Sequence, residues 1–177
     1  MVRSTARPCV AGAGVSMEYG PPHRRTALVV DDDIFLLRAV ADLLEEEGYD
    51  VHTASNGFSA MRRAVELRPD VILLDLRLPE RSGSEVLGEL RTSAATRDMA
   101  VVVVSGYPDG LSDAQMADID GLVAKPFDER DLLYTVHRAI QRAATRRAEV
   151  APVGAAAHGA QPARAHRAVS APRTRRR

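Results

Sequence analysis

The sequence predicts an α/β domain in which a doubly wound, five-stranded parallel sheet carries helices on both faces. Five short apolar runs alternate along the chain with segments whose apolar residues recur at helical spacing. The apolar runs are nearly continuous, a pattern typical of parallel strands that are buried on both faces. Each strand–helix–strand repeat implies a right-handed crossover, which places successive strands parallel in one sheet.

The predicted strands are short runs in which valine, leucine and isoleucine predominate. In chain order they cover residues 26–30, 49–53, 71–75, 101–104 and 122–124. Polar or turn-forming residues bound each run, as expected where a strand gives way to a loop.

The predicted helices follow these strands. They cover residues 34–47, a segment opened by Ser55-Asn56-Gly57 and ended by Pro69, and residues 84–91, 109–119 and 129–147. The first has a clear helical stripe, with apolar residues at 36, 37, 40, 43 and 44. We expect Asp33 to cap its first turn and Gly48 to follow its last. The fourth is short and only weakly apolar.

Charge divides the chain into three parts. A length of 177 residues allows one domain of ordinary size with tails, and the formal net charge of zero hides an asymmetry. Residues 26–143 contain 22 acidic and 12 basic side chains, whereas residues 144–177 contain eight arginines and one glutamate. We therefore predict a disordered basic N-terminal extension (1–25), a folded domain (26–147) and a disordered tail rich in alanine, proline and arginine (148–177).

Composition disfavours several classes of protein. No apolar run approaches the roughly 18 residues that span a bilayer, so we predict no membrane insertion. Residues 9–15 resemble the apolar part of a signal peptide only weakly and are interrupted by glycine. Cys9 is the only cysteine, which excludes a disulfide within the chain and disfavours a cysteine-based zinc site. The predicted location is the cytoplasm.

Polar side chains of matching chemistry end four of the predicted strands. Asp31-Asp32-Asp33 follows the first strand, Asp75 ends the third, Ser105 follows the fourth, and Lys125 follows the fifth. Open parallel sheets bind ligands at the carboxyl ends of their strands. Paired carboxylates beside a third form an oxygen-rich pocket suited to Mg²⁺. A lone carboxylate there can attack phosphorus, while a hydroxyl and a cation shield the charged oxygens of the transferred group.

Each of these residues also has an ordinary explanation when taken alone. Acidic residues before a helix cap its amides and complement its dipole, and Asp33 is expected to do so. Asp75 could be a loop residue, Ser105 a turn residue and Lys125 a solvated charge. Their joint occurrence at strand ends, in this order, favours a metal-dependent phosphoryl site.

These stretches resemble the receiver domain of bacterial two-component response regulators, over about residues 26–144. The matching motifs are Leu28-Val29-Val30-Asp31-Asp32-Asp33, Leu73-Leu74-Asp75-Leu76-Arg77-Leu78-Pro79 with Gly83, Val103-Val104-Ser105-Gly106 and Lys125-Pro126-Phe127. The resemblance implies the flavodoxin-like receiver fold.

The resemblance also implies a role for each site residue. Asp75 would be the phosphoacceptor, and Asp31 and Asp32 would be the acidic pair that binds Mg²⁺. The backbone carbonyl of Arg77 would be a further metal ligand. Ser105 and Lys125 would contact the phosphoryl group, and the Lys125–Pro126 peptide bond would be cis.

One departure from the family's pattern concerns Leu122, three residues before Lys125. The family usually carries Phe or Tyr there, and that aromatic ring swings inward when the Ser/Thr moves toward the phosphoryl group. Leucine is smaller and lacks a polar tip, so we expect a weaker or differently routed conformational change. Tyr107 lies nearby in the sequence, but nothing in the sequence indicates that it substitutes.

The resulting functional prediction is a single-domain response regulator. It would accept a phosphoryl group from a histidine kinase or phosphotransfer protein, catalyse its own phosphorylation and dephosphorylation, and signal to a downstream protein rather than act as a metabolic enzyme. The alternative is a DNA-associated regulator whose basic tails bind nucleic acid. A haloacid dehalogenase-type phosphatase is disfavoured, because that family requires a second Asp where this chain has Arg77.

Overall fold

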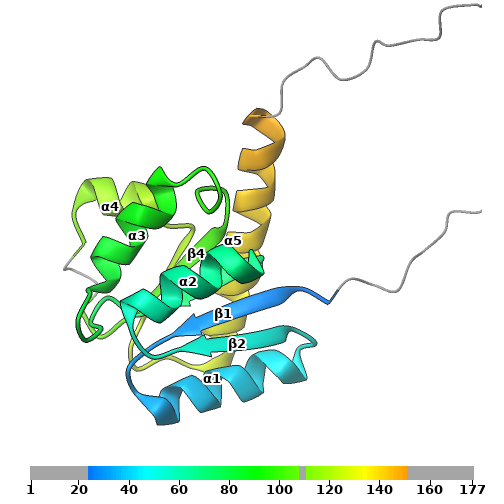
Figure 1. Cartoon of the computed structure of the whole chain (residues 1–177). Coiled ribbons are helices and arrows are strands. Elements are labelled where there is room, and N and C mark those ends of the chain that lie inside the picture. Colours follow the sequence, from blue (N-terminus) through cyan, green and yellow to red (C-terminus); the bar gives the residue numbers. More distant parts are fainter. Residues whose placement is uncertain (1–23, 108–110, 151–177) are drawn as a thin grey trace, which may run out of the picture.

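The computed structural model describes residues 24–107 and 111–150, in which strands and helices alternate from β1 to α5 (Figure 1). The strands are β1 (Thr26–Val30), β2 (Asp50–Ala54), β3 (Val71–Leu74), β4 (Ala100–Ser105) and β5 (Gly121–Ala124). The helices are α1 (Ile34–Glu46), α2 (Gly57–Leu67), α3 (Gly83–Thr92), α4 (Asp113–Asp118) and α5 (Glu129–Val150).

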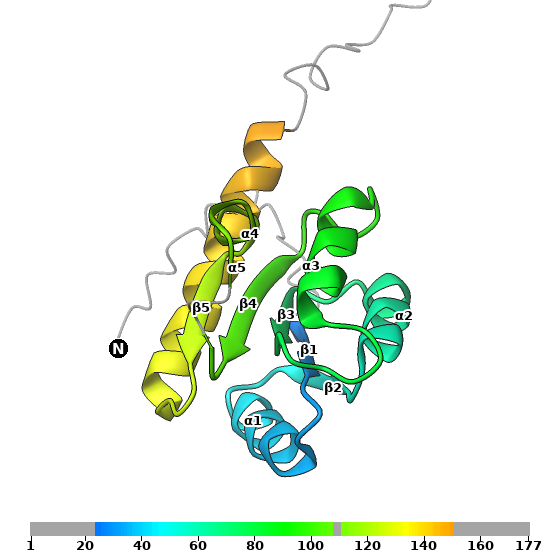
Figure 2. The ribbon, with the colours of Figure 1, turned by 90° about the vertical axis from the view of Figure 1, so that its left-hand side faces the viewer.

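All five strands lie parallel in one sheet, in the order β2-β1-β3-β4-β5. Helices α1 and α5 cover one face, and α2 and α3 cover the other, with α4 next to α3 (Figure 2). The predicted doubly wound sheet is therefore confirmed. The order reverses direction between β1 and β3, because the chain first adds β2 outside β1 and then builds outward from β3 on the other side.

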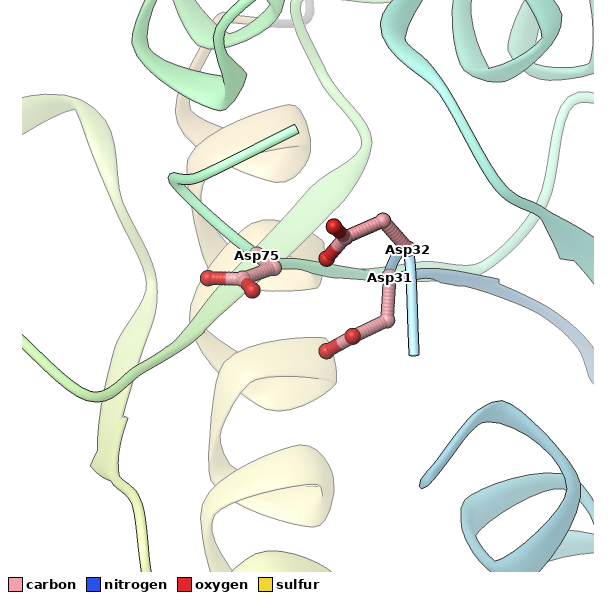
Figure 3. Close-up of side chains that lie close together, drawn as sticks. All are labelled: Asp31, Asp32 and Asp75. Carbon is pink, nitrogen blue, oxygen red and sulfur yellow. The ribbon is translucent and has the colours of Figure 1, made fainter. Parts of the chain in front are cut away.

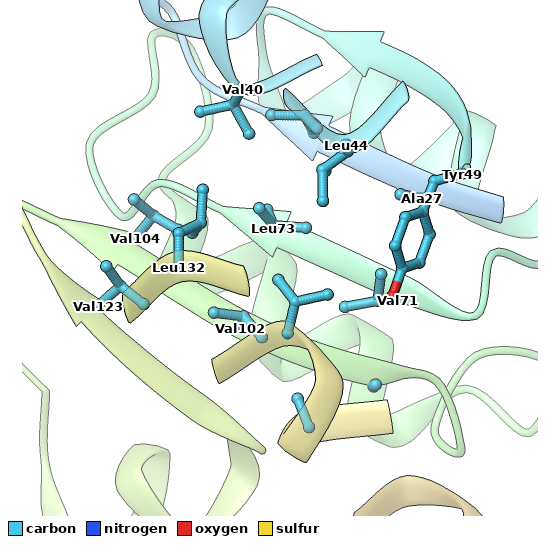
Figure 4. Close-up of a cluster of buried hydrophobic side chains, with 14 of the residues drawn as sticks. Ala27, Val40, Leu44, Tyr49, Val71, Leu73, Val102, Val104, Val123 and Leu132 are labelled. Atoms are coloured by element: carbon cyan, nitrogen blue, oxygen red, sulfur yellow. The ribbon is translucent and has the colours of Figure 1, made fainter. Parts of the chain in front are cut away.

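Alternate residues of the central strands enter two different hydrophobic cores. Ala27 and Val29 pack with α1 and α5, whereas Leu28 and Val30 pack with α2 and α3. Figure 4 shows the first core, where side chains of α1 and α5 meet across the strands. Since both faces of each strand are covered, both sets of alternate residues are apolar, which explains the continuous apolar runs in the sequence.

Local hydrogen bonds define the ends of α1 as predicted. The Asp33 carboxylate accepts from the backbone N–H groups of Phe35 (2.9 Å) and Leu36 (3.3 Å), so Asp33 is the N-cap. At the other end Gly48 has a φ of 88°. Its N–H donates to Glu45, and that of Tyr49 donates to Leu44, the pair of bonds that defines a Schellman motif.

Several element boundaries differ from the sequence prediction. The helix expected over 109–119 is only α4, because Ser112 and Gln115 form a capping box that fixes its start; residues 108–110 lie outside the described structure. Strand β2 begins one residue later than expected, since the Tyr49 ring is buried in the core. Helix α5 continues to Val150, three residues beyond the predicted end of the domain. The two predicted tails lie outside the described residues, apart from these last helical residues and residues 24 and 25.

Asp120 anchors the far end of α5 to the sheet. Its buried carboxylate accepts from the Val101 N–H (2.9 Å), from Arg91 (3.0 Å) and from Arg146 of α5 (2.5 Å). Burial lowers the pKa of Arg91, although Asp120 opposes that shift. This cluster lies at the amino end of β5, at the opposite edge of the sheet from the residues described next. Over the described ranges, no helix combines the length and the apolar character that crossing a bilayer requires.

Candidate functional site

The strand order brings the predicted site residues to one edge of the sheet. Asp31 and Asp32 follow β1, and Asp75 follows β3, which is hydrogen-bonded to β1 along its length. Ser105 ends β4, the next strand, and Lys125 follows β5 beside it. The point where the strand order reverses lies between β1 and β3. A ligand site is expected there in sheets of this kind.

Three carboxylates converge at this point, as Figure 3 shows. Asp31, Asp32 and Asp75 each offer one oxygen, and these oxygens lie within 4.8 Å of one another. Asp31 and Asp75 are 4% and 7% exposed, whereas Asp32 faces solvent. An all-oxygen donor set open on one side fits a hard divalent cation such as Mg²⁺, which keeps several of its own waters. The residues present therefore fit the predicted metal.

Backbone hydrogen bonds hold the site residues just past the strand ends. The Asp31 N–H donates to Ala54 (3.1 Å), the Asp75 N–H to Val30 (2.9 Å) and the Lys125 N–H to Ser105 (2.9 Å). Each bond extends the sheet ladder by one step beyond a regular strand. The carboxylates and the ammonium group are thus carried by rigid backbone rather than by free loops.

Lys125 joins the two buried carboxylates. Its Nζ donates to Oδ2 of Asp31 at 2.5 Å and to Oδ2 of Asp75 at 2.9 Å. Burial alone would lower the pKa of Lys125, but hydrogen bonds and charge from Asp31 and Asp75 raise it, so the ammonium stays charged. Burial raises the pKa of Asp31, against the opposing effect of Lys125. A cation beside Asp75 is well placed to stabilise negative charge that a ligand brings to this carboxylate.

Asp33, the third acid of the run, lies outside the cluster of oxygens. Its N–H donates to Asp31 Oδ1 (2.9 Å), while its carboxylate caps α1. The acidic triplet therefore divides into two residues of the site and one structural cap, as predicted. The Lys125–Pro126 peptide bond is cis, again as expected.

Ser105 and Arg77 complete the surroundings of Asp75. Ser105 is fully buried at the end of β4, and its Oγ accepts from the Tyr107 N–H at 3.1 Å. The Arg77 N–H donates to Asp75 Oδ1 at 3.3 Å. All the residues predicted for this site thus come together at one edge of the sheet.

Sequence reasoning missed one contact at the site, between the side chains of Arg77 and Tyr107. The guanidinium carbon of Arg77 lies 4.1 Å from the centroid of the Tyr107 ring. The signal was present only in combination with strand order. Each residue follows the end of its strand by a similar distance, and β3 and β4 are neighbours.

Chemically, the site combines a nearly buried carboxylate, a fixed cation, a hydroxyl and an oxygen-rich pocket. Such a set can hold a divalent ion and a phosphoryl group on one carboxylate.

Comparisons with known proteins agree with this geometry. A family model described as "response regulator receiver domain" matches residues 27–137. Among curated proteins, the chain is 41% identical over 117 residues to the transcriptional regulatory protein KdpE of Mycobacterium tuberculosis, covering 65% of this chain and 50% of that protein. It is 35% identical over 117 residues to RpaA of Synechocystis, a DNA-binding dual master transcriptional regulator, covering 65% of this chain and 48% of RpaA. The chain spans about half the length of the curated relatives it matches.

Solved structures give the same result. A response regulator receiver domain protein from Clostridium thermocellum matches with a TM-score of 0.63 and 29% identity, over 69% of this chain and 98% of that one. TrrA, a response regulator from Thermotoga maritima solved in complex with Mg²⁺–BeF, matches with a TM-score of 0.60 and 31% identity, over 65% and 98%. Fold, site geometry and family match all agree that this chain belongs to the response regulator receiver domain family.

Proposed function

We propose that Asp75 accepts a phosphoryl group from a phosphohistidine of a histidine kinase or phosphotransfer protein. The observation that carries this proposal is the bridge from Lys125 to Asp31 and Asp75 beside the exposed Asp32. An Asp75 oxygen would attack phosphorus, the bond from phosphorus to the imidazole nitrogen would break, and the ring nitrogen would leave with the electron pair. Hydrolysis of the resulting acyl phosphate would end the signal.

The surrounding residues would manage charge during this transfer. Lys125 would move its hydrogen bond from Asp75 to an oxygen of the phosphoryl group, and Ser105 would donate its hydroxyl proton to another. Mg²⁺, when bound to Asp31, Asp32, Asp75 and the Arg77 carbonyl, would neutralise the clustered negative charge. The protein would thus be a signalling component in the cytoplasm rather than an enzyme with a released metabolite.

The test of this proposal is uptake of phosphate from a small donor. The purified chain incubated with acetyl phosphate or phosphoramidate should gain one phosphoryl group in intact-mass spectrometry, and only when a divalent cation is present. Absence of the added mass with Mg²⁺ would contradict the proposal.

Output through contact with a downstream protein is the first candidate, as in a single-domain regulator. Regulation of DNA is the second, and two observations favour it. The relatives KdpE and RpaA are named as transcriptional regulators. Residues 144–177 carry eight arginines, whose binding to phosphates would release counterions. A salt titration of DNA binding by the full chain and by a chain shortened after Val150 would separate the two.

Asp32→Ala is expected to weaken Mg²⁺ binding by roughly ten-fold or more, because even groups that only orient a metal ligand contribute that much to affinity. Asp32 is the exposed member of the oxygen cluster, so its removal should leave the fold intact. Isothermal titration calorimetry measures the effect. Asp33→Asn is the matched control, since it removes a neighbouring charge but keeps an N-cap. Equal affinities in Asp32→Ala and wild type would reject Asp32 as a ligand.

Leu122 is expected to support only a modest conformational response to phosphorylation. It is half-buried on β5 and paired with Val103 of β4. A small side chain offers little difference in contact between two states, and such differences drive allostery. Amide hydrogen exchange with and without beryllofluoride should show small changes over residues 113–122. Large protection changes there that disappear in Leu122→Ala would show that leucine is a full switch residue.

A further inference from the structure

Arg77 and Tyr107 lie beside the site and have no role in the chemistry described so far. Their side chains stack, with the guanidinium carbon of Arg77 at 4.1 Å from the Tyr107 ring centroid. This distance is well inside the roughly 6 Å over which a cation is attracted to an aromatic face. Both residues are exposed, Tyr107 to 61%. The stack therefore contributes little to the hydrophobic cores.

The stack closes a ring of contacts around the reacting end of the sheet. The Arg77 N–H donates to Asp75 Oδ1, and the Tyr107 N–H donates to Ser105 Oγ. Asp75 and Ser105 lie at the ends of the paired strands β3 and β4. Each stacked residue is thus bonded through its backbone to one side chain of the site. The stack connects the two loops that leave the sheet on either side of Asp75.

Two other Arg–aromatic pairs in the described residues show what a plain surface stack looks like. Arg81 lies 5.7 Å from the Phe58 ring, and Arg138 lies 5.8 Å from the Tyr134 ring. Arg138 and Tyr134 lie one turn apart on α5 and also share a hydrogen bond. The Arg77–Tyr107 pair is closer, and both its members are bonded to side chains of the site.

We propose that Arg77 and Tyr107 form a positioning pair that slows hydrolysis of the acyl phosphate on Asp75, an inference that rests on the proposed function. In hydrolysis, a water oxygen attacks phosphorus, the bond from phosphorus to the Asp75 oxygen breaks, and the carboxylate leaves with the electron pair. The proton of the attacking water passes to solvent. By tying the loops after β3 and β4 together, the stack limits how far they separate to admit that water. It also keeps Ser105 oriented through the Tyr107 N–H.

Loss of the stack is expected to shorten the lifetime of phosphorylated Asp75. An exposed cation–π contact is worth about 0.5–1 kcal/mol, so Tyr107→Ala and Arg77→Ala should each speed dephosphorylation about two- to five-fold. The double variant should be no faster than the single ones, because both remove the same contact. Tyr107→Phe keeps an aromatic face for Arg77 and should retain the wild-type lifetime. Mg²⁺ affinity should stay unchanged in Tyr107→Ala.

The measurement is the decay of the phosphorylated full-length chain, followed by intact-mass spectrometry after the small donor is removed. Arg138→Ala is the matched control, since it breaks a remote stack and should leave the lifetime as it is. An unchanged lifetime in Tyr107→Ala, or additive effects in the double variant, would overturn the proposal. So would a longer lifetime. Failure of the wild-type chain to take up phosphate is a different result and would contradict the proposed function instead.

Discussion

Asp75→Asn is expected to abolish phosphorylation, lowering uptake from acetyl phosphate by roughly three orders of magnitude or more, to the uncatalysed background. The carboxylate oxygen is the proposed nucleophile, and an amide has no comparable anionic oxygen. The change is nearly isosteric, and the amide oxygen can still accept the hydrogen bond that Lys125 Nζ makes to Asp75 at 2.9 Å. Loss of uptake would therefore report chemistry rather than unfolding. Intact-mass spectrometry with Mg²⁺ measures the result.

Asp33→Asn provides the comparison for this experiment. Asp33 lies in the same acidic run but outside the oxygen cluster, and asparagine is as good an N-cap as aspartate. This variant should take up phosphate at the wild-type rate. An added phosphoryl group on the Asp75→Asn protein would move the acceptor to another residue and refute the assignment.

The fold and the placement of the site were predictable because strands buried on both faces have a distinctive composition. Alternate residues such as Leu28 and Val29 enter different cores, so the runs of apolar residues are unbroken and easily recognised. Polar residues directly after such runs must lie at one edge of the sheet. That geometric rule brought Asp31, Asp75 and Ser105 together before any coordinates were considered.

Side-chain contacts across loops were beyond the reach of the sequence. The stack of Arg77 on Tyr107 depends on β3 and β4 being neighbours, and alternating elements do not fix strand order. The buried Asp120 is a similar case, because its arginine partners come from α3 and α5, 29 and 26 residues away in the chain. The start of α4 was missed because a capping box at Ser112, rather than apolar periodicity, determines it.

Gly83→Ala is expected to destabilise the domain by about 3 kcal/mol, the upper end for a forced steric overlap. Gly83 begins α3, directly against the backbone that carries the proposed phosphoacceptor. A Cβ at this position would lie 2.0 Å from the carbonyl oxygen of Asp75 and 2.8 Å from the Leu76 Cα. Both are backbone atoms, so no change of rotamer relieves the overlap. Either α3 or the segment after β3 must move, which would also break the bond from the Gly83 N–H to the Leu76 carbonyl (2.9 Å).

The same helix supplies a control in which the identical substitution should have the opposite sign. Gly88 lies in the interior of α3, and a Cβ there would meet nothing within 4 Å. Gly88→Ala should therefore stabilise the domain by about 0.5–1 kcal/mol, since glycine in a helix loses more conformational freedom on folding. Urea unfolding of both variants measures the two free energies. Because Asp75 rides on the displaced segment, Gly83→Ala should also weaken Mg²⁺ binding under conditions where the variant is still folded. A free energy within 0.5 kcal/mol of wild type for Gly83→Ala would mean that α3 docks differently on the loop that carries Asp75 and Arg77.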